Sequence, residues 1–158
     1  MTPHFTLAEF VRSDTAAVRH IDNTLPRELV ANALATLQML ERIRAWLCQA
    51  AGHEVPITIT SGYRSPALNQ AIGSLGRSDH PRAMAADWVA PTLGTPTELA
   101  AMLAPQVGVL GIGQLILEYP DRGGTRAWVH TSTAMPMRPV NRIITITDAG
   151  VLPGIVGA

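Results

Sequence analysis

A change of hydrophobic period between residues 51 and 57 constrains the fold more than any other feature of this sequence. Before it, from Arg27 to about Ala51, apolar residues recur with the period of an α-helix over several turns. Pro26 suits the first turn of such a helix, and Gly52 suits its C-cap. After it, the segment PITIT (residues 56–60) alternates and is rich in β-branched residues, which is typical of a strand. A long helix that runs directly into a strand predicts a helix packed on a sheet.

The rest of the chain supports one α+β domain with an antiparallel sheet and helices packed on it. A capping-box pattern, TLAE, predicts a short helix from Thr6 to about Arg12, and Gly73 ends another expected helix. The expected elements are helices over residues 6–12, 27–51, 67–72 and 95–103, strands over 56–60, 84–89, 114–119, 128–131 and 142–147, and loops over 13–25 and 74–83. We expect a single domain over residues 1–158, with a core of about 4–147 and a loose tail from Asp148.

Composition excludes several classes of function. The formal net charge is zero and no basic stripe appears, so nucleic acid is not an expected partner. The single cysteine, Cys48, cannot form a disulfide within the chain. The first residues, MTPHFTLAEF, are neither a basic leader nor a long apolar run, so we expect no signal peptide and no membrane span. The expected product is a monomer made in the cytoplasm.

Candidate metal ligands gather in the stretch SDHPRAMAADW. His80 and Asp87 lie seven positions apart, and His130 follows on a predicted strand. Zinc binds His nitrogen, Cys sulfur and carboxylate oxygen, and this chain has no cysteine pair. Asp87 lies inside an apolar segment, where a carboxylate needs a positive partner. That partner is a metal ion; the alternatives are a salt bridge to Arg64 or Arg82, or a capping role for Asp87.

The motifs SGYRSPALN, S-x-H-x6-D and WVH together resemble the zinc D-Ala-D-Ala carboxypeptidase family. That family includes phage endolysins, vancomycin-resistance D-Ala-D-Ala dipeptidases and L-Ala-D-Glu peptidases, and this chain looks most similar to the small phage-type members. The resemblance extends over roughly residues 4–147. It implies a hedgehog/DD-peptidase-like fold and a zinc ion on His80, Asp87 and His130.

The same resemblance suggests substrate-binding residues. Arg64 of the SGYRS turn would hold a substrate carbonyl or carboxylate and stabilise an oxyanion, and a guanidinium fork suits that task. The alternative for Arg64 is a structural bridge to Asp87 or to a loop carbonyl. Tyr63 would support the turn or line the substrate groove. Ser78 would bind near the metal ligands and could touch substrate.

The general base is less directly indicated. In several branches of the family an Asp or Glu three positions before the last histidine ligand takes this role, but that position is Ala127 here. Glu118, on the preceding predicted strand, is the replacement candidate, and Asp121 is a lesser one with a turn role as its alternative. A four-residue loop from Asp121 would pair Glu118 with Ala127 and turn it away from His130. A five-residue loop would pair it with Trp128 and place it on the face of His130.

Two further positions depart from the family pattern. Ala83 stands where the family has glycine, and a positive φ there would cost roughly 1 kcal/mol or more. Gly113 stands where relatives often have an aspartate just before Gln114.

The function expected from these features is zinc-dependent cleavage of peptidoglycan stem peptides or cross-links at a D-alanyl bond, in carboxypeptidase or endopeptidase mode. Catalysis would use Glu118 and Arg64, and the protein could be a phage lysin that acts at the bacterial cell wall. One alternative is a catalytically inactive wall-binding or virion structural module with the same fold. Another is a regulatory peptide-binding domain.

Overall fold

The computed structural model describes residues 2–74, 78–122 and 126–157. The helices are α1 (Leu7–Val11), α2 (Asp14–Val18), α3 (Val30–Ala51), α4 (Pro66–Ala71) and α5 (Pro96–Leu103). Short 3₁₀ turns occupy Arg27–Leu29 (η1), His80–Arg82 (η2), Ala104–Gln106 (η3), Pro120–Arg122 (η4) and Pro139–Asn141 (η6). The strands are β1 (Thr58–Ser61), β2 (Ala85–Val89), β3 (Gln114–Glu118), β4 (Trp128–Ser132), β5 (Ile143–Thr147) and β6 (Gly150–Pro153).

Local sequence signals account for the helix ends. α3 follows the turn η1 and ends at Gly52, whose left-handed φ of 73° lets its N–H reach the carbonyl of Cys48. α5 begins with a complete capping box, in which Thr95 and Glu98 cap each other's backbone. Thr6 caps α1 by accepting a hydrogen bond from the N–H of Glu9. The long helix predicted from the sequence is therefore confirmed.

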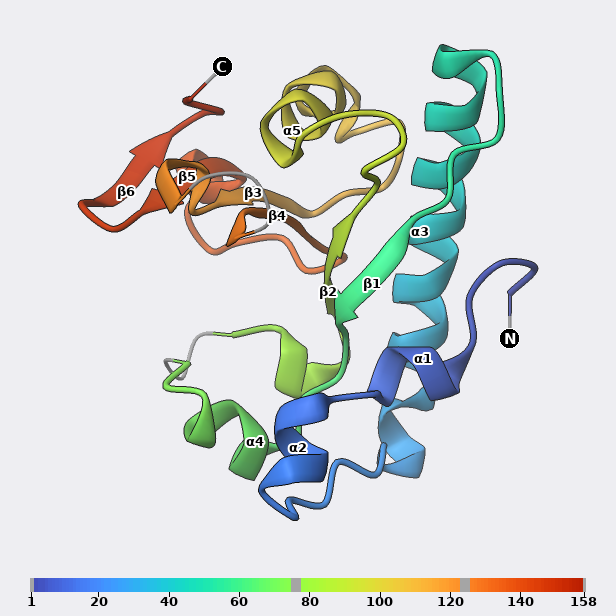
Figure 1. Ribbon diagram of the computed structural model, residues 1–158, viewed down its shortest axis with the longest axis vertical. Helices are drawn as coiled ribbons and strands as arrows, with labels where there is room; N and C mark the ends of the chain where they lie inside the picture. The colour runs from blue at the N-terminus through green and yellow to red at the C-terminus, as the bar shows by residue number, and fades with distance from the viewer. Residues whose placement is uncertain (1, 75–77, 123–125, 158) are drawn as a thin grey trace.

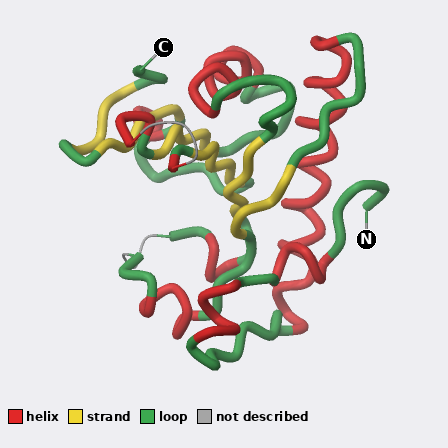
Figure 2. The backbone as a smooth tube through the Cα atoms, in the orientation of Figure 1, coloured by secondary structure: helices red, strands yellow, loops and turns green. Residues whose placement is uncertain are grey.

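All six strands form one sheet in the order β1-β2-β4-β3-β5-β6. Figures 1 and 2 show the sheet as a band across the middle of the molecule, with α5 above it and α2 and α4 below. Four of the five neighbouring pairs are antiparallel, but β3 and β5 are parallel. The expected α+β fold with an antiparallel sheet is confirmed, and β3–β5 is its one parallel pair among the described strands. Because β4 already lies between β2 and β3, β5 has to join the other edge of β3, and it does so in the same direction.

Two local expectations need correction. Residues 13–25 were expected to be irregular, but they contain α2, which Ser13 caps by accepting from the N–H of Ala16. The tail from Asp148 was expected to be loose, but β6 turns back at Gly150 and pairs with β5. Both elements are four or five residues long, which is too short for a hydrophobic period to reveal them.

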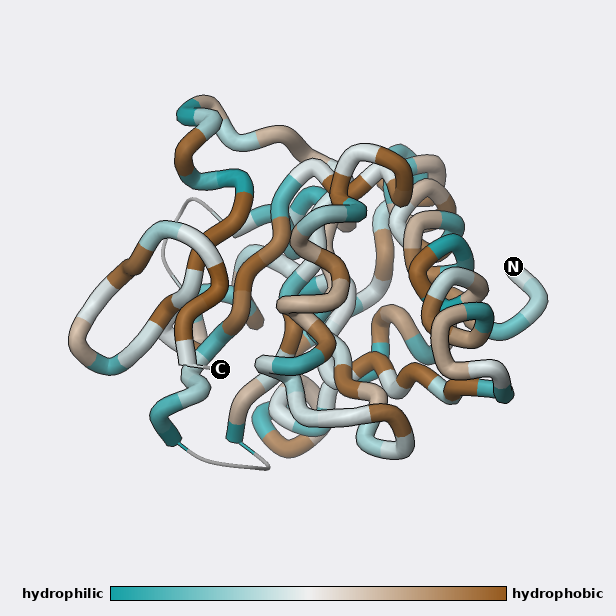
Figure 3. The backbone as a smooth tube through the Cα atoms, turned by 90° about the horizontal axis from the view of Figure 1, so that it is seen from above, coloured by the Kyte–Doolittle hydropathy of each residue, from teal (hydrophilic) through white to brown (hydrophobic). Residues whose placement is uncertain are grey.

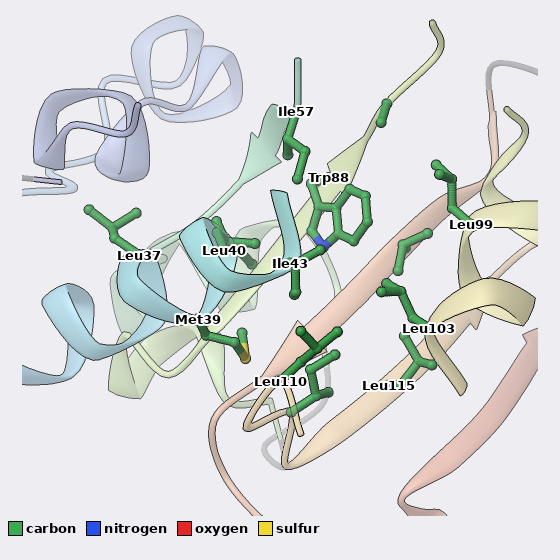
Figure 4. Packing of buried hydrophobic residues seen from close by; sticks show 14 of the residues in the cluster. Leu37, Met39, Leu40, Ile43, Ile57, Trp88, Leu99, Leu103, Leu110 and Leu115 are labelled. Carbon is green, nitrogen blue, oxygen red and sulfur yellow. The ribbon is translucent and has the colours of Figure 1, made fainter. Parts of the chain in front are cut away.

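The sheet has a core face and a site face. On the core face, Trp88, Val129 and Leu117 pack against the apolar sides of α3 and α5, as Figure 4 shows around Trp88. Seen from above, the chain of α3 alternates between hydrophobic and hydrophilic residues, as a helix does when one side packs on a core (Figure 3). The opposite face of the sheet carries Asp87 and His130, which are directly paired across β2 and β4.

Candidate metal centre

Three segments bring the candidate ligands together. Asp87 and His130 are cross-strand neighbours, and His80 lies in the turn η2 just before β2. The chain leaves η2 through Ala83, which has a left-handed φ of 55°. All three residues are buried: His80 is 2% exposed, Asp87 is 3% exposed and His130 is 6% exposed.

The donor atoms of these residues converge on one point. His80 Nε2 lies 3.2 Å from Asp87 Oδ1 and 3.3 Å from His130 Nδ1, and the latter two atoms are 2.8 Å apart. A tetrahedral zinc ion with ligands at about 2.0–2.1 Å holds its ligand atoms about 3.3 Å apart. Two nitrogens and one oxygen at nearly this spacing, all buried, fit a zinc ion.

A backbone carbonyl fixes the orientation of His80. The ring nitrogen Nδ1 lies 2.6 Å from the carbonyl oxygen of Gly62, which can only accept. Nδ1 therefore carries the proton, and the lone pair of Nε2 faces Asp87 and His130. This is the arrangement by which metal-ligating histidines are held in one tautomer.

The electrostatic setting favours an ionised carboxylate. Burial opposes charge on all three residues, and it lowers the pKa of His80 below its ordinary value. For His130, the hydrogen bond and charge of Asp87 outweigh burial and raise the pKa. For Asp87, the two histidines outweigh burial and hold the pKa well below its ordinary range. Asp87 is thus in the state that can ligate a cation.

Arg64 completes the surroundings of Asp87. Its guanidinium forms an ion pair with Asp87 Oδ2, and its Nε donates to Ser61 Oγ at 2.8 Å. The bridge from Arg64 to Asp87, which the sequence left open as an alternative, is present, whereas Arg82 pairs with Asp79 instead. Because Arg64 takes Oδ2, Oδ1 is the oxygen that faces the histidines.

Glu118 lies beside this cluster. It pairs with Trp128 across β3 and β4, so it shares the face of His130, and its Oε1 is 3.8 Å from His130 Nδ1. The choice between the four-residue and five-residue loops from Asp121 falls on residues 123–125, which lie outside the described residues. Burial, together with the negative charge of Asp87, raises the pKa of Glu118 from its ordinary 4.5 to about 7. A carboxylate with such a pKa is suited to exchange protons near neutral pH.

Other predicted residues take less direct places. Ser78 Oγ accepts from the N–H of His80 at 3.4 Å, so it lies next to a ligand. Tyr63 is only 3% exposed and belongs to the hydrophobic core, so the structure gives it a supporting place and not one on the groove. Asp121 is exposed and accepts from the N–H of Asp148, as a turn residue does.

A buried link that the sequence reading missed joins the two ligand-bearing segments. Ser132 Oγ donates to Asp79 Oδ2 at 2.7 Å, and both residues are buried. Asp79 precedes His80, and Ser132 follows His130 by two positions on the same face of β4. The expected strand ended at residue 131, one position short of the residue whose side chain makes this contact.

The departures at Ala83 and Gly113 have structural explanations. Ala83 does adopt the positive φ that its position predicted. At Gly113, an added Cβ would lie only 2.5 Å from the carbonyl oxygen of Ala134. This chain therefore has no room at residue 113 for the aspartate that the resemblance suggested.

Two cavities share Trp128 in their walls. The first, of about 660 Å³, contains Arg64 and Asp87 in its wall together with β1 and parts of α1, α2 and α4. The second, also about 660 Å³, is mostly apolar and is lined by residues that include Val89, Pro96 and Ala127. Thr60 and Trp128 belong to both cavities, so the two adjoin.

Fold and site together define an α+β protein with a buried His–Asp–His cluster that could hold a metal ion, and with a neighbouring carboxylate. A sequence model described as peptidase M15 matches residues 3–120, most of the 158-residue chain. The chain therefore belongs to the peptidase M15 family, the zinc D-Ala-D-Ala carboxypeptidase family. The matched range ends before β4, so it is the structure that brings His130 to the site.

Family membership supports a zinc-dependent metallopeptidase of the peptidoglycan-related type. A comparison with curated proteins finds no matching sequence. Among the described residues, no helix has the length and apolar character needed to cross a membrane.

Proposed function

We propose that this protein is a zinc peptidase that hydrolyses a D-alanyl bond in peptidoglycan stem peptides or their cross-links. The observation that carries the proposal is the convergence of His80 Nε2, Asp87 Oδ1 and His130 Nδ1 with Glu118 Oε1, 3.8 Å from His130 Nδ1. Three buried donors at the spacing of a zinc tetrahedron, with a carboxylate of raised pKa beside them, have the parts of a hydrolytic metal site.

Each protein group has a distinct task in this proposal. His80, Asp87 and His130 hold the ion, which when bound lowers the pKa of a coordinated water and polarises the scissile carbonyl. Glu118 accepts the proton of the attacking water and later passes it to the leaving amine. Arg64 keeps Asp87 oriented, and because it also lines the first cavity it is placed to donate to the substrate oxygen that gains negative charge.

The setting of the activity is part of the same proposal. We propose that the enzyme acts as a monomer at the bacterial cell wall, in the manner of a phage lysin, and reaches the wall with the help of a partner pore or on lysis. The resemblance to small phage-type members supports this setting.

Metal analysis and a peptidoglycan digest test the proposal. The purified protein is expected to hold about one zinc ion per chain, and to release peptides from purified peptidoglycan until a chelator is added. Mass spectrometry of the products separates the two modes, because a carboxypeptidase releases free D-alanine and an endopeptidase releases longer fragments.

Variants distinguish the enzyme from an inactive module. Glu118→Gln should abolish turnover and keep the zinc, whereas Glu41→Gln, which alters an ion pair with His4, should leave both unchanged. Zinc without cleavage of several wall types would instead indicate a retired peptidase that serves as a wall-binding or structural module. Absence of zinc would refute the metal centre itself.

A further inference from the structure

The strand β1 forms one edge of the sheet, next to the metal centre. It pairs only with β2 in the strand order, and within the described ranges the backbone of residues 58–60 makes no hydrogen bond outside that ladder. Just past the strand, the edge is closed, because the N–H of Tyr63 donates to the carbonyl of Phe10 at 2.9 Å. The open part of the edge is therefore Thr58 to Thr60.

The first cavity runs along this open edge. All four residues of β1 line it, together with Arg64 and Asp87. The side chain of Ile59 packs toward the core, on the face opposite to Asp87, so Ile59 reaches the cavity through its place on the edge. The cavity thus follows the strand and ends at a candidate metal ligand.

An unpaired strand edge presents N–H and C=O groups that alternate outward and can be satisfied by an extended peptide. We propose that β1 binds the peptide substrate as an added β-strand and so directs its scissile bond toward Asp87 and Arg64. This proposal rests on the proposed peptidase function. The three open residues of the strand span about 10 Å at roughly 3.3 Å each, enough to pair with about three substrate residues.

The cavity walls fit an extended peptide with small or polar side chains. Thr58, which pairs with Val89, lies on the site face, and the register of β1 shifts at the exposed residue Thr60. Both threonines line the cavity, together with the hydroxyl residues Ser13 and Thr15 of the α1–α2 segment. In a paired strand, the substrate side chains on the site face would lie near these hydroxyl groups. The main-chain hydrogen bonds would supply affinity whatever those side chains are.

Amide hydrogen exchange in the zinc-loaded Glu118→Gln protein tests the pairing without turnover. The probe is a synthetic stem pentapeptide that ends in D-Ala-D-Ala, and its binding is measured by calorimetry in parallel. Bound peptide should slow exchange of outward-facing amides in residues 58–60 at least tenfold. The strand β6, at the other edge of the same sheet, is the internal control and should not change.

Methylation of the α-peptide nitrogens of the probe, one at a time, adds a second readout. Loss of one main-chain hydrogen bond weakens binding about tenfold. Methylation of an amide that faces β1 should have this effect, and methylation of the next α-amide, which faces away, should change affinity less than about threefold. An even response at all positions, or slowed exchange without any methylation effect, would refute strand pairing.

The outcomes separate this proposal from the proposed function. Cleavage by the wild-type protein with no slowed exchange in β1 would overturn the strand-pairing proposal and leave the peptidase function intact. Binding along β1 with no cleavage would overturn the peptidase function and leave the docking edge intact. A peptide that is neither bound nor cleaved would overturn both.

Discussion

Replacement of the raised-pKa carboxyl, Glu118→Gln, should stabilise the metal-free protein at alkaline pH. In the folded chain the pKa of Glu118 is raised from 4.5 to about 7, by burial and by the charge of Asp87. Below about pH 4.5 the side chain is protonated in the folded and the unfolded chain alike, so it has no effect on stability. Between the pKa of 4.5 in the unfolded chain and the pKa of about 7 in the folded chain, Glu118 is ionised only in the unfolded chain. The free energy of unfolding therefore falls as the pH rises, until the pH passes about 7.

The size of this loss follows from the two pKa values. At about 1.4 kcal/mol for each pH unit, the interval from 4.5 to 7 corresponds to about 3 kcal/mol. Glutamine keeps the size of the side chain and removes the charge. The free energy of unfolding of the variant should therefore exceed that of the wild type by about 3 kcal/mol at pH 8 and by less than about 1 kcal/mol at pH 5.

Urea unfolding of chelator-treated wild type and variant, at both pH values, measures these differences. Glu41→Gln is the matched control, because hydrogen bonds from His4 outweigh burial and lower the pKa of Glu41. Glu41→Gln should lower the free energy of unfolding at pH 8, whereas Glu118→Gln should raise it. The reasoning fails if Glu118→Gln does not stabilise at pH 8, or if its effect is the same at both pH values.

Four further substitutions test other parts of the structure. Ser132→Ala removes the hydroxyl that binds Asp79, and competition with a chelator should show zinc affinity reduced about 10- to 100-fold. Gly113→Asp should lower the free energy of unfolding by more than about 3 kcal/mol, because its Cβ would meet the Ala134 carbonyl; a neutral effect in thermal unfolding would contradict this. Ala83→Gly should change stability by less than about 1 kcal/mol, since relief at the left-handed φ offsets the lost buried methyl group. Ala83→Val should cost more than about 2 kcal/mol in the same assay, because β-branched residues avoid this region.

Much of the site could be predicted from the sequence because two of its residues differ in polarity from the residues next to them in the chain. Asp87 is a carboxylate within an apolar run, and His130 follows apolar residues on a strand, so both were expected to be held in fixed places. The resemblance of the surrounding motifs to a known zinc-ligand pattern then predicted His80 as the third ligand. The structure brings the same three side chains together, which is the geometry that the prediction requires.

What the sequence could not supply depends on register and on contacts between distant segments. The face of Glu118 follows from its pairing with Trp128, and one residue more or less in the intervening loop would reverse it. The parallel placement of β5 follows from the insertion of β4 between two earlier strands, which no local period reports. The short strand β6 carries Gly150 and Pro153, residues that usually indicate a loop.

The strand order has a consequence for biosynthesis. β4 lies between β2 and β3 although it leaves the ribosome after both, so the centre of the sheet cannot close until β4 has been made. Until then, β2 and β3 each present an unsatisfied edge, and the third metal ligand is missing. A zinc ion held by all three residues would bind only the closed form and would draw the equilibrium toward it. Availability of the metal in the cell should therefore govern how long a newly made chain remains exposed to aggregation and proteolysis.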